Sequence, residues 1–171
     1  MLFLMTLSRK RLQSMLEFKP NSIVLLQGVL SHGAMAKIKT KGGVHVVISE
    51  GRPTLRAAEH NSRYFLDKKI KPVIICDNMA GSLFFNSLVK EVVIACQYAD
   101  NSGALCDTGA LILVVLAKKH KIPVRLVDGE HKKHYLGNPK DLLMLKGIPT
   151  APVKTKAFTP TVEWVPAKYL K

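Results

Sequence analysis

The residues of this chain best suited to chemistry follow short apolar segments, at the point where each segment ends. The polar or reactive side chains at these ends are Glu50, Arg52, Asp77, Asn78, Cys96 and Asn101. The segments before them are rich in Val and Ile, which is typical of buried parallel strands. Open α/β sheets bind ligands outside the carboxyl ends of their strands. The sequence therefore predicts that these six side chains surround one site.

Each of these residues has a structural and a chemical interpretation. Arg52 can clamp a phosphate through two parallel hydrogen bonds, or it can form an ion pair with Glu50 or Asp77 that holds its own loop. Asp77 most simply caps the helical turn that follows it. Cys96 is a candidate nucleophile, but no sequence neighbour would lower the pKa of its thiol, so a small residue that ends a strand is the favoured interpretation. Asn101 either fixes a turn or contacts a ligand.

No metal or cofactor site is expected. His131 and His134 are three residues apart in a lysine-rich turn and lack a third ligand. The cysteines Cys76, Cys96 and Cys106 have neither metal-ligand spacing nor a close pair in the sequence. Cys76 lies in an apolar run and is expected to be a buried thiol. An odd number of cysteines indicates a reducing, cytoplasmic compartment.

The elements that must position these residues alternate along the chain. Strands are expected at residues 22–27, 44–50, 73–76, 92–95 and 122–127, and helices at 7–18, 29–39, 54–69, 80–89 and 107–119. This alternation predicts an α/β fold with a mostly parallel sheet that helices cover on both faces. The helix at 107–119 is almost wholly apolar, so we expect it to pack on two sides, within the domain or at a subunit interface.

Three regions are expected along the chain. Residues 1–20 form an N-terminal segment with one short helix, residues 21–148 form the α/β domain, and residues 149–171 form an extended, proline-containing tail. The tail carries Trp164 and is expected to pack on the domain or on a partner. The apolar start of the chain is too short for a signal peptide or a membrane span.

The net charge of +14 is the most unusual bulk property. The lysines are scattered over turns and helix ends, so we expect a solvated surface that favours anionic ligands. Only 6% of the residues are aromatic, whereas nucleic-acid platforms interleave basic and aromatic side chains. A nucleic-acid partner is therefore not expected. A membrane is not expected either, because no apolar window of the sequence reaches the length of a membrane span.

Several motifs together resemble a known family. Glu50-Gly51-Arg52-Pro53 is similar to the Glu-Ser/Thr-Arg-Pro segment of the α, β and δ regulatory subunits of translation initiation factor 2B, and of their relatives methylthioribose-1-phosphate isomerase and ribose-1,5-bisphosphate isomerase. Further similar segments are Asp77-Asn78-Met79-Ala80, Asn101-Ser102-Gly103, Gly109-Ala110, residues 116–123 and Phe158-Thr159-Pro160. The resemblance covers residues 22–167. It implies a three-layer, Rossmann-like domain with a doubly wound sheet, without most of the family's N-terminal helical domain.

Three positions depart from the isomerase pattern. Where the isomerases carry a catalytic thiol, this chain has Gly28, and their catalytic aspartate falls on Cys96. The lysine before the family's Gly-Thr becomes Asp107, whose negative charge disfavours an incoming anion. An aldose–ketose isomerisation needs proton-transferring groups at both reacting carbons, and these changes leave no obvious pair.

The resemblance and its departures together favour a non-catalytic or catalytically degenerate regulatory or assembly protein. It would bind a sugar phosphate or nucleotide through Arg52, Glu50, Asn78, Asn101 and Gly109. The alternative is an active sugar-phosphate isomerase that uses Cys96 and Asp77, the latter also binding sugar hydroxyls as its counterpart is thought to do. A pure assembly module is the third possibility. The expected partners are further copies in a homodimer or higher oligomer, and a separate chain that supplies the family's N-terminal domain.

Overall fold

The computed structural model describes residues 18–131, 135–145 and 147–170. The helix expected at residues 7–18 lies outside these ranges except for Phe18, and His134 lies outside them too. Within the described ranges, no helix is both long enough and apolar enough to cross a membrane.

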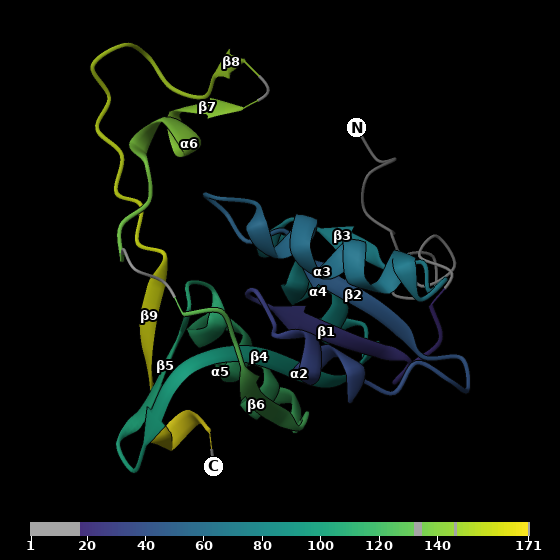
Figure 1. Ribbon diagram of the computed structural model, residues 1–171. Helices are drawn as coiled ribbons and strands as arrows, with labels where there is room; N and C mark the ends of the chain where they lie inside the picture. Colours follow the sequence, from purple (N-terminus) through teal and green to yellow (C-terminus); the bar gives the residue numbers. More distant parts are fainter. Residues whose placement is uncertain (1–17, 132–134, 146, 171) are drawn as a thin grey trace, which may run out of the picture.

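A curled, mostly parallel sheet forms the centre of the molecule (Figure 1). Its parallel strands lie in the order β3 (Val73–Ile75), β2 (His45–Ser49), β1 (Ile23–Gln27), β4 (Val89–Asp100) and β6 (Val124–Asp128). The antiparallel strands β5 (Gly103–Asp107) and β9 (Val162–Pro166) extend it beyond β4. The chain thus has the expected Rossmann-like α/β fold.

Helices cover both faces of the sheet, because successive strand residues point to opposite sides. Val24 and Leu26 of β1 belong to the core beneath α2 (His32–Ala36) and α3 (Arg56–Asp67). Ile23 and Leu25 belong to the opposite core, beneath α4 (Ala80–Phe85) and α5 (Ala110–His120). Side chains of β1 are at most 3% exposed, which is why this strand is apolar almost throughout.

The segment after residue 95 differs from the expectation. The strand expected at 92–95 runs on to Asp100, and a turn at residues 101–102 leads into β5 instead of a loop. Ala104 and Cys106 are both fully buried, with the two-residue period of a strand, but the segment is too short for this pattern to stand out. The helix expected at 107–119 consequently begins at Ala110.

Two other helices are shorter than expected. The helix expected at 29–39 is only α2, whose first turn is capped by the Ser31 side chain accepting a hydrogen bond from the Ala34 amide. The helix expected at 80–89 is α4, which ends at Phe85 because β4 already begins at Val89.

The apolar helix α5 is buried on one side only. Its buried side chains are Ala110, Leu113, Val114 and Ala117. Ile112 is 64% exposed and Val115 is 42% exposed in the single chain. Packing within the domain therefore explains why one face of α5 is apolar, while the apolar side chains on its other face are exposed in the single chain.

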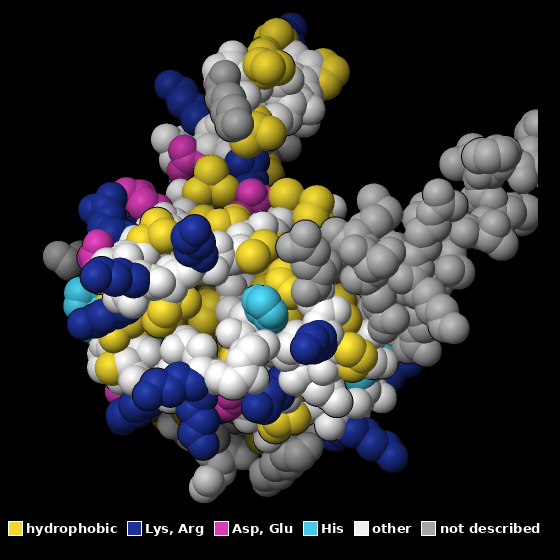
Figure 2. Space-filling model, turned by 90° about the vertical axis from the view of Figure 1, so that its right-hand side faces the viewer, with side chains coloured by type: hydrophobic (Ala, Val, Ile, Leu, Met, Phe, Trp, Pro, Cys, Tyr) yellow, Lys and Arg dark blue, Asp and Glu magenta, His cyan; other side chains and the backbone are white. Residues whose placement is uncertain are grey.

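The C-terminal segment contributes to the sheet. Strand β9 pairs with β5, and Val165 within it is fully buried. Before it, α6 (Pro139–Leu143), β7 (Met144–Leu145) and β8 (Ile148–Pro149) form an arm that projects from the sheet (Figure 1). Figure 2 shows apolar side chains on this projection, and Lys and Arg side chains spread over the face below it without gathering into one patch.

Candidate functional site

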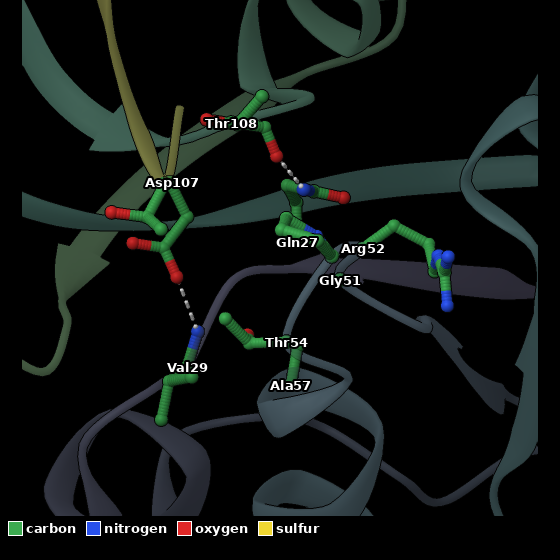
Figure 3. Close-up of a pocket in the computed structure, with 10 residues that line it drawn as sticks. Gln27, Val29, Gly51, Arg52, Thr54, Ala57, Asp107 and Thr108 are labelled. Atoms are coloured by element: carbon green, nitrogen blue, oxygen red, sulfur yellow. Dashed lines mark hydrogen bonds between the residues drawn. The ribbon is translucent and has the colours of Figure 1, made fainter. Parts of the chain in front are cut away.

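The loops that follow β1, β2 and β5 meet at one edge of the sheet and enclose a narrow pocket (Figure 3). Its lining residues come from these loops, from the start of α3 and from the segment before β9, and they include Gln27, Gly51, Arg52, Asp107, Thr108 and Thr161. The enclosed volume is about 10 Å³, which is the size of one water site. The floor of this edge is therefore filled mainly by the chain itself.

Two side chains close the floor. Asp107 is 6% exposed, and its carboxylate accepts a hydrogen bond from the Val29 amide at 3.0 Å. The Gln27 side-chain amide donates to the Thr108 carbonyl at 2.6 Å. These bonds join the loop after β1 to the end of β5, as the dashed lines in Figure 3 show.

Gly28 allows this close approach. It has φ of +80°, and a Cβ atom there would lie 2.8 Å from the Asp107 Cβ and 2.9 Å from the Ala95 Cβ. The Gly28 carbonyl also accepts a hydrogen bond from the buried Asn61 side chain at 2.8 Å. Gly28 thus has a packing role in this chain.

Asp77 holds the loop after β2. One of its carboxylate oxygens accepts from the Gly51 amide at 3.0 Å, and the other accepts from the Arg52 amide at 2.8 Å. The residue at the cap of the following 3-10 turn is Cys76, which makes no side-chain capping bond. The expectation that Asp77 caps this turn is therefore wrong, because its carboxylate is used across the strand ends instead.

Arg52 lies at the edge of the pocket, and its guanidinium points away from Asp107 and Thr108 (Figure 3). Among the described residues it has no ion-pair partner, so the expected ion pair with Glu50 or Asp77 is not formed. The residue also lines a second, wider space of about 280 Å³ next to the narrow pocket. The other residues of this wider space are mostly apolar: Pro53, Thr108, Leu142, Phe158, Thr159 and Pro160.

Glu50 and Asn78 line neither the narrow pocket nor the wider space. Glu50 is close to Cys76, since its carboxylate is the largest cause of the raised pKa of that thiol. Cys76 is partly exposed rather than buried as expected, because β3 is the edge strand of the sheet. Asn78 is exposed in the turn that follows.

Asn101 does not lie with Arg52 and Asp77. It is exposed in the turn between β4 and β5, at the opposite end of β5 from Asp107. The sequence suggests otherwise because its local pattern does not reveal β5, so that the chain is expected to pass from Asn101 directly into a helix. Gly109 does lie at the site: its φ is +98°, and a Cβ there would be 2.7 Å from the Gln27 amide nitrogen.

Cys96 is near the site but does not line either space. Its thiol donates to the Tyr98 carbonyl at 3.0 Å. Burial raises the pKa of the Cys96 thiol above its ordinary value, so at neutral pH the thiol is protonated. Among the described residues, no group of three or more side chains has the arrangement of a metal site.

Of the ten residues that line the narrow pocket, only Arg52 belongs to the predicted site; the polar residues that the prediction missed include Gln27, Asp107, Thr108 and Thr161. Gln27 is a polar residue at the end of an apolar strand. The same signal identifies Arg52 and Asp77, so it could have identified Gln27 as well. Thr161 belongs to the C-terminal segment, and only the pairing of β9 with β5 brings it to the pocket.

Comparison with known proteins places this geometry in a family. The sequence profile of the Initiation factor 2 subunit family matches residues 5–171. Methylthioribose-1-phosphate isomerase of Carboxydothermus hydrogenoformans is 30% identical over 137 residues, which cover 73% of this chain and 40% of that protein. An enzyme of the same name from Thermus thermophilus is 28% identical over 81% of this chain and 46% of its own length.

Solved structures share the fold. The crystal structure of the translation initiation factor eIF-2B delta subunit from A. fulgidus superposes with a TM-score of 0.73 at 16% identity, covering 90% of this chain and 52% of that one. The 5-methylthioribose 1-phosphate isomerase of Pyrococcus horikoshii gives a TM-score of 0.74 at 20% identity, covering 90% and 49%. The chain thus spans about half of these relatives or less, and within that span it belongs to the Initiation factor 2 subunit family.

Proposed function

We propose that this chain is a non-catalytic member of its family that binds a sugar phosphate or nucleotide beside Arg52. The observation that carries the proposal is that both candidate catalytic groups serve the fold. Asp77 uses its two carboxylate oxygens to hold the backbone of residues 51–52, and Cys96 donates its proton to a backbone carbonyl. Neither group lines the narrow pocket or the wider space.

The chemistry of isomerisation supports this proposal. Moving a hydrogen between the first two carbons of a sugar needs a base and an acid within hydrogen-bond reach of the substrate. Gly28 cannot supply the thiol that the isomerases use, and the space for a side chain there is occupied by Asp107 and Ala95. Without a donor and acceptor at both carbons, binding would not lead to turnover.

The wider space supports a ligand-binding role. At about 280 Å³ it approaches the size of small-molecule sites, and its lining combines mostly apolar residues with Arg52. Because Arg52 has no ion-pair partner among the described residues, its guanidinium is available for a phosphate. The net charge of +14 adds a field that attracts anions.

A thermal-shift panel of sugar phosphates and nucleoside monophosphates tests the binding role. A ligand at about a hundred times its dissociation constant stabilises the fold by roughly 2.7 kcal/mol, or roughly 5–10 °C for a chain of this size. The shift should disappear in Arg52→Ala. Arg63→Ala is the matched control, because it also removes one positive charge but lies on the exposed face of α3, paired with Glu59. Absence of any shift, or equal loss in both variants, would count against a site at Arg52.

Active sugar-phosphate isomerisation is the second candidate, favoured by the 30% identity to a methylthioribose-1-phosphate isomerase. Incubation with methylthioribose 1-phosphate, followed by NMR for the ketose product, tests it directly. Turnover that is lost in Cys96→Ser or Asp77→Asn would replace the non-catalytic proposal. Binding without turnover would support it.

Assembly into a homodimer or higher oligomer is part of the same proposal. The exposed Ile112 and Val115 on α5 offer an apolar face that a second copy could cover. Light scattering coupled to size exclusion would measure the oligomer, and Ile112→Lys should shift it toward the monomer. A monomeric wild-type protein at micromolar concentration would contradict this part.

A further inference from the structure

Two cysteines that are ten residues apart in the sequence face each other in the sheet. Cys96 of β4 and Cys106 of β5 are directly opposed partners in the antiparallel pair. Directly opposed residues of such a pair have Cα atoms about 4.5–5.5 Å apart, within the range of about 4.4–6.8 Å that a disulfide spans. The pairing of the two strands is therefore compatible with a disulfide between these residues.

The side chains also point to the same side of the sheet. Cys106 is part of the core beneath α5, and Cys96 packs against that same core. The two thiols lie close enough to affect each other, since the pKa of the Cys106 thiol is raised first by burial and next by Cys96. The register of the strand pair shifts just after Cys96, which is a β-bulge that increases the local twist of the hairpin.

We propose that Cys96 and Cys106 form a redox-active dithiol, which a low-molecular-weight disulfide such as oxidised glutathione converts into an intramolecular disulfide. The proposal goes beyond the ligand-binding function and does not depend on it.

The two cysteines have different roles in this exchange. Cys96 is partly exposed, so its sulfur can reach the small disulfide, whereas Cys106 is fully buried. The Cys96 thiolate attacks one glutathione sulfur, a mixed disulfide forms and one reduced glutathione leaves. Cys106 then loses its proton and attacks the Cys96 sulfur, which releases the second reduced glutathione. Two protein thiols are oxidised, and one glutathione disulfide is reduced to two thiols.

The location gives the modification a consequence. Asp107, which holds Val29 at the floor of the narrow pocket, directly follows Cys106. A covalent link between β4 and β5 would fix the end of β5 that carries this carboxylate. Cys76, the third cysteine, lies at the end of β3, separated from β4 by β2 and β1, so it cannot join this pair.

The test is oxidation of the folded full chain with oxidised glutathione, followed by alkylation of the remaining thiols and peptide mass spectrometry. The wild type should lose two hydrogens and give a linked Cys96–Cys106 peptide. Cys106→Ala should stop at a stable glutathione adduct on Cys96, because the resolving thiol is missing. Cys96→Ala should give no adduct at Cys106, and Cys76→Ala should behave as the wild type.

The rate gives an independent readout. Burial raises the pKa of both thiols, so the reaction should be slow at neutral pH and accelerate about tenfold per pH unit below the pKa of Cys96. A folded wild type that yields glutathione adducts or linked chains but no Cys96–Cys106 peptide would overturn the proposal. So would a linked peptide that forms only under denaturing conditions.

Discussion

Replacing Gly28 with alanine should destabilise the protein strongly, because the site is built around the missing side chain. The backbone of Gly28 has φ of +80°, and the new Cβ would lie 2.8 Å from the Asp107 Cβ, 2.8 Å from its Oδ2 and 2.9 Å from the Ala95 Cβ. All three distances are shorter than carbon and oxygen atoms tolerate. Relief would require a shift of β4 or β5, both of which are held by the sheet.

The magnitude has two parts. A left-handed conformation costs a residue with a Cβ about 1–2 kcal/mol. Overpacking in a well-packed region costs a further 1–3 kcal/mol or so. The free energy of unfolding should therefore fall by about 2–5 kcal/mol, which lowers the melting temperature by roughly 4–20 °C in a chain of this length.

Alanine substitutions at two other glycines distinguish the cost of the left-handed backbone from the cost of overpacking. Gly42 has φ of +74° but nothing within 4 Å of its built Cβ, so Gly42→Ala should cost only about 1–2 kcal/mol. Gly33 lies in α2 with ordinary backbone geometry and open space, so Gly33→Ala should be neutral or stabilising by up to about 1 kcal/mol. The expected order of stability is Gly33→Ala, wild type, Gly42→Ala and then Gly28→Ala.

Urea unfolding followed by circular dichroism would measure all four proteins under one set of conditions. The slopes against urea should agree, so that the midpoints report stability alone. If Gly28→Ala were no less stable than Gly42→Ala, the close packing of Gly28 on Asp107 would be refuted. A side chain that carries a thiol would then also fit at this position.

Three further changes test other contacts. Asp77→Ala should cost about 1–3 kcal/mol of unfolding free energy in urea, because two backbone amides lose their acceptor, and Asp77→Asn should recover part of it. The pKa of Asp100 should lie below 3.8, chiefly because the Ser102 hydroxyl donates to its carboxylate; Ser102→Ala should raise it in an NMR titration. Because the pKa of Asp100 is lower in the folded than in the unfolded protein, the ionised carboxylate stabilises the fold. This stabilisation is present above the unfolded-state pKa and is lost as the pH falls through the folded-state pKa. Arg125→Gln should cost about 1 kcal/mol or less in low salt, and the difference should shrink in high salt, because it breaks the half-buried pair with Glu91 at 2.7 Å. An unchanged titration of Asp100, or a salt-independent Arg125 effect, would contradict the contacts named.

The local pattern of the sequence is sufficient to predict the parallel strands of the sheet. Strands β1, β2 and β3 lie where apolar runs predict them, and β4 begins a few residues before its predicted start, because buried parallel strands need apolar side chains on both faces. The ends of β1 and β2 can be located from the polar residues that follow them. Arg52 and Asp77 are correctly placed together by this argument, although the hydrogen bonds between them involve the backbone of Arg52.

The antiparallel half could not be predicted in the same way. Strand β5 has five residues, and its pairing with β9 joins segments more than fifty residues apart. Neither segment has a strong local pattern, so only the completed sheet decides that they are strands. This error moves Asn101 into the predicted site, and it hides the opposition of Cys96 and Cys106.

The sequence by itself determined the fold class, the family and the edge of the sheet at which Arg52 and Asp77 meet, because these depend on residue types and on short-range order. Tertiary structure alone decided what the residues at that edge do. Asp77 and Asp107 could each have faced a ligand, but their carboxylates accept hydrogen bonds from backbone amides of the loops after β2 and β1. Hydrogen-bond partners are chosen by proximity in space, and a buried amide must find an acceptor wherever the fold supplies one.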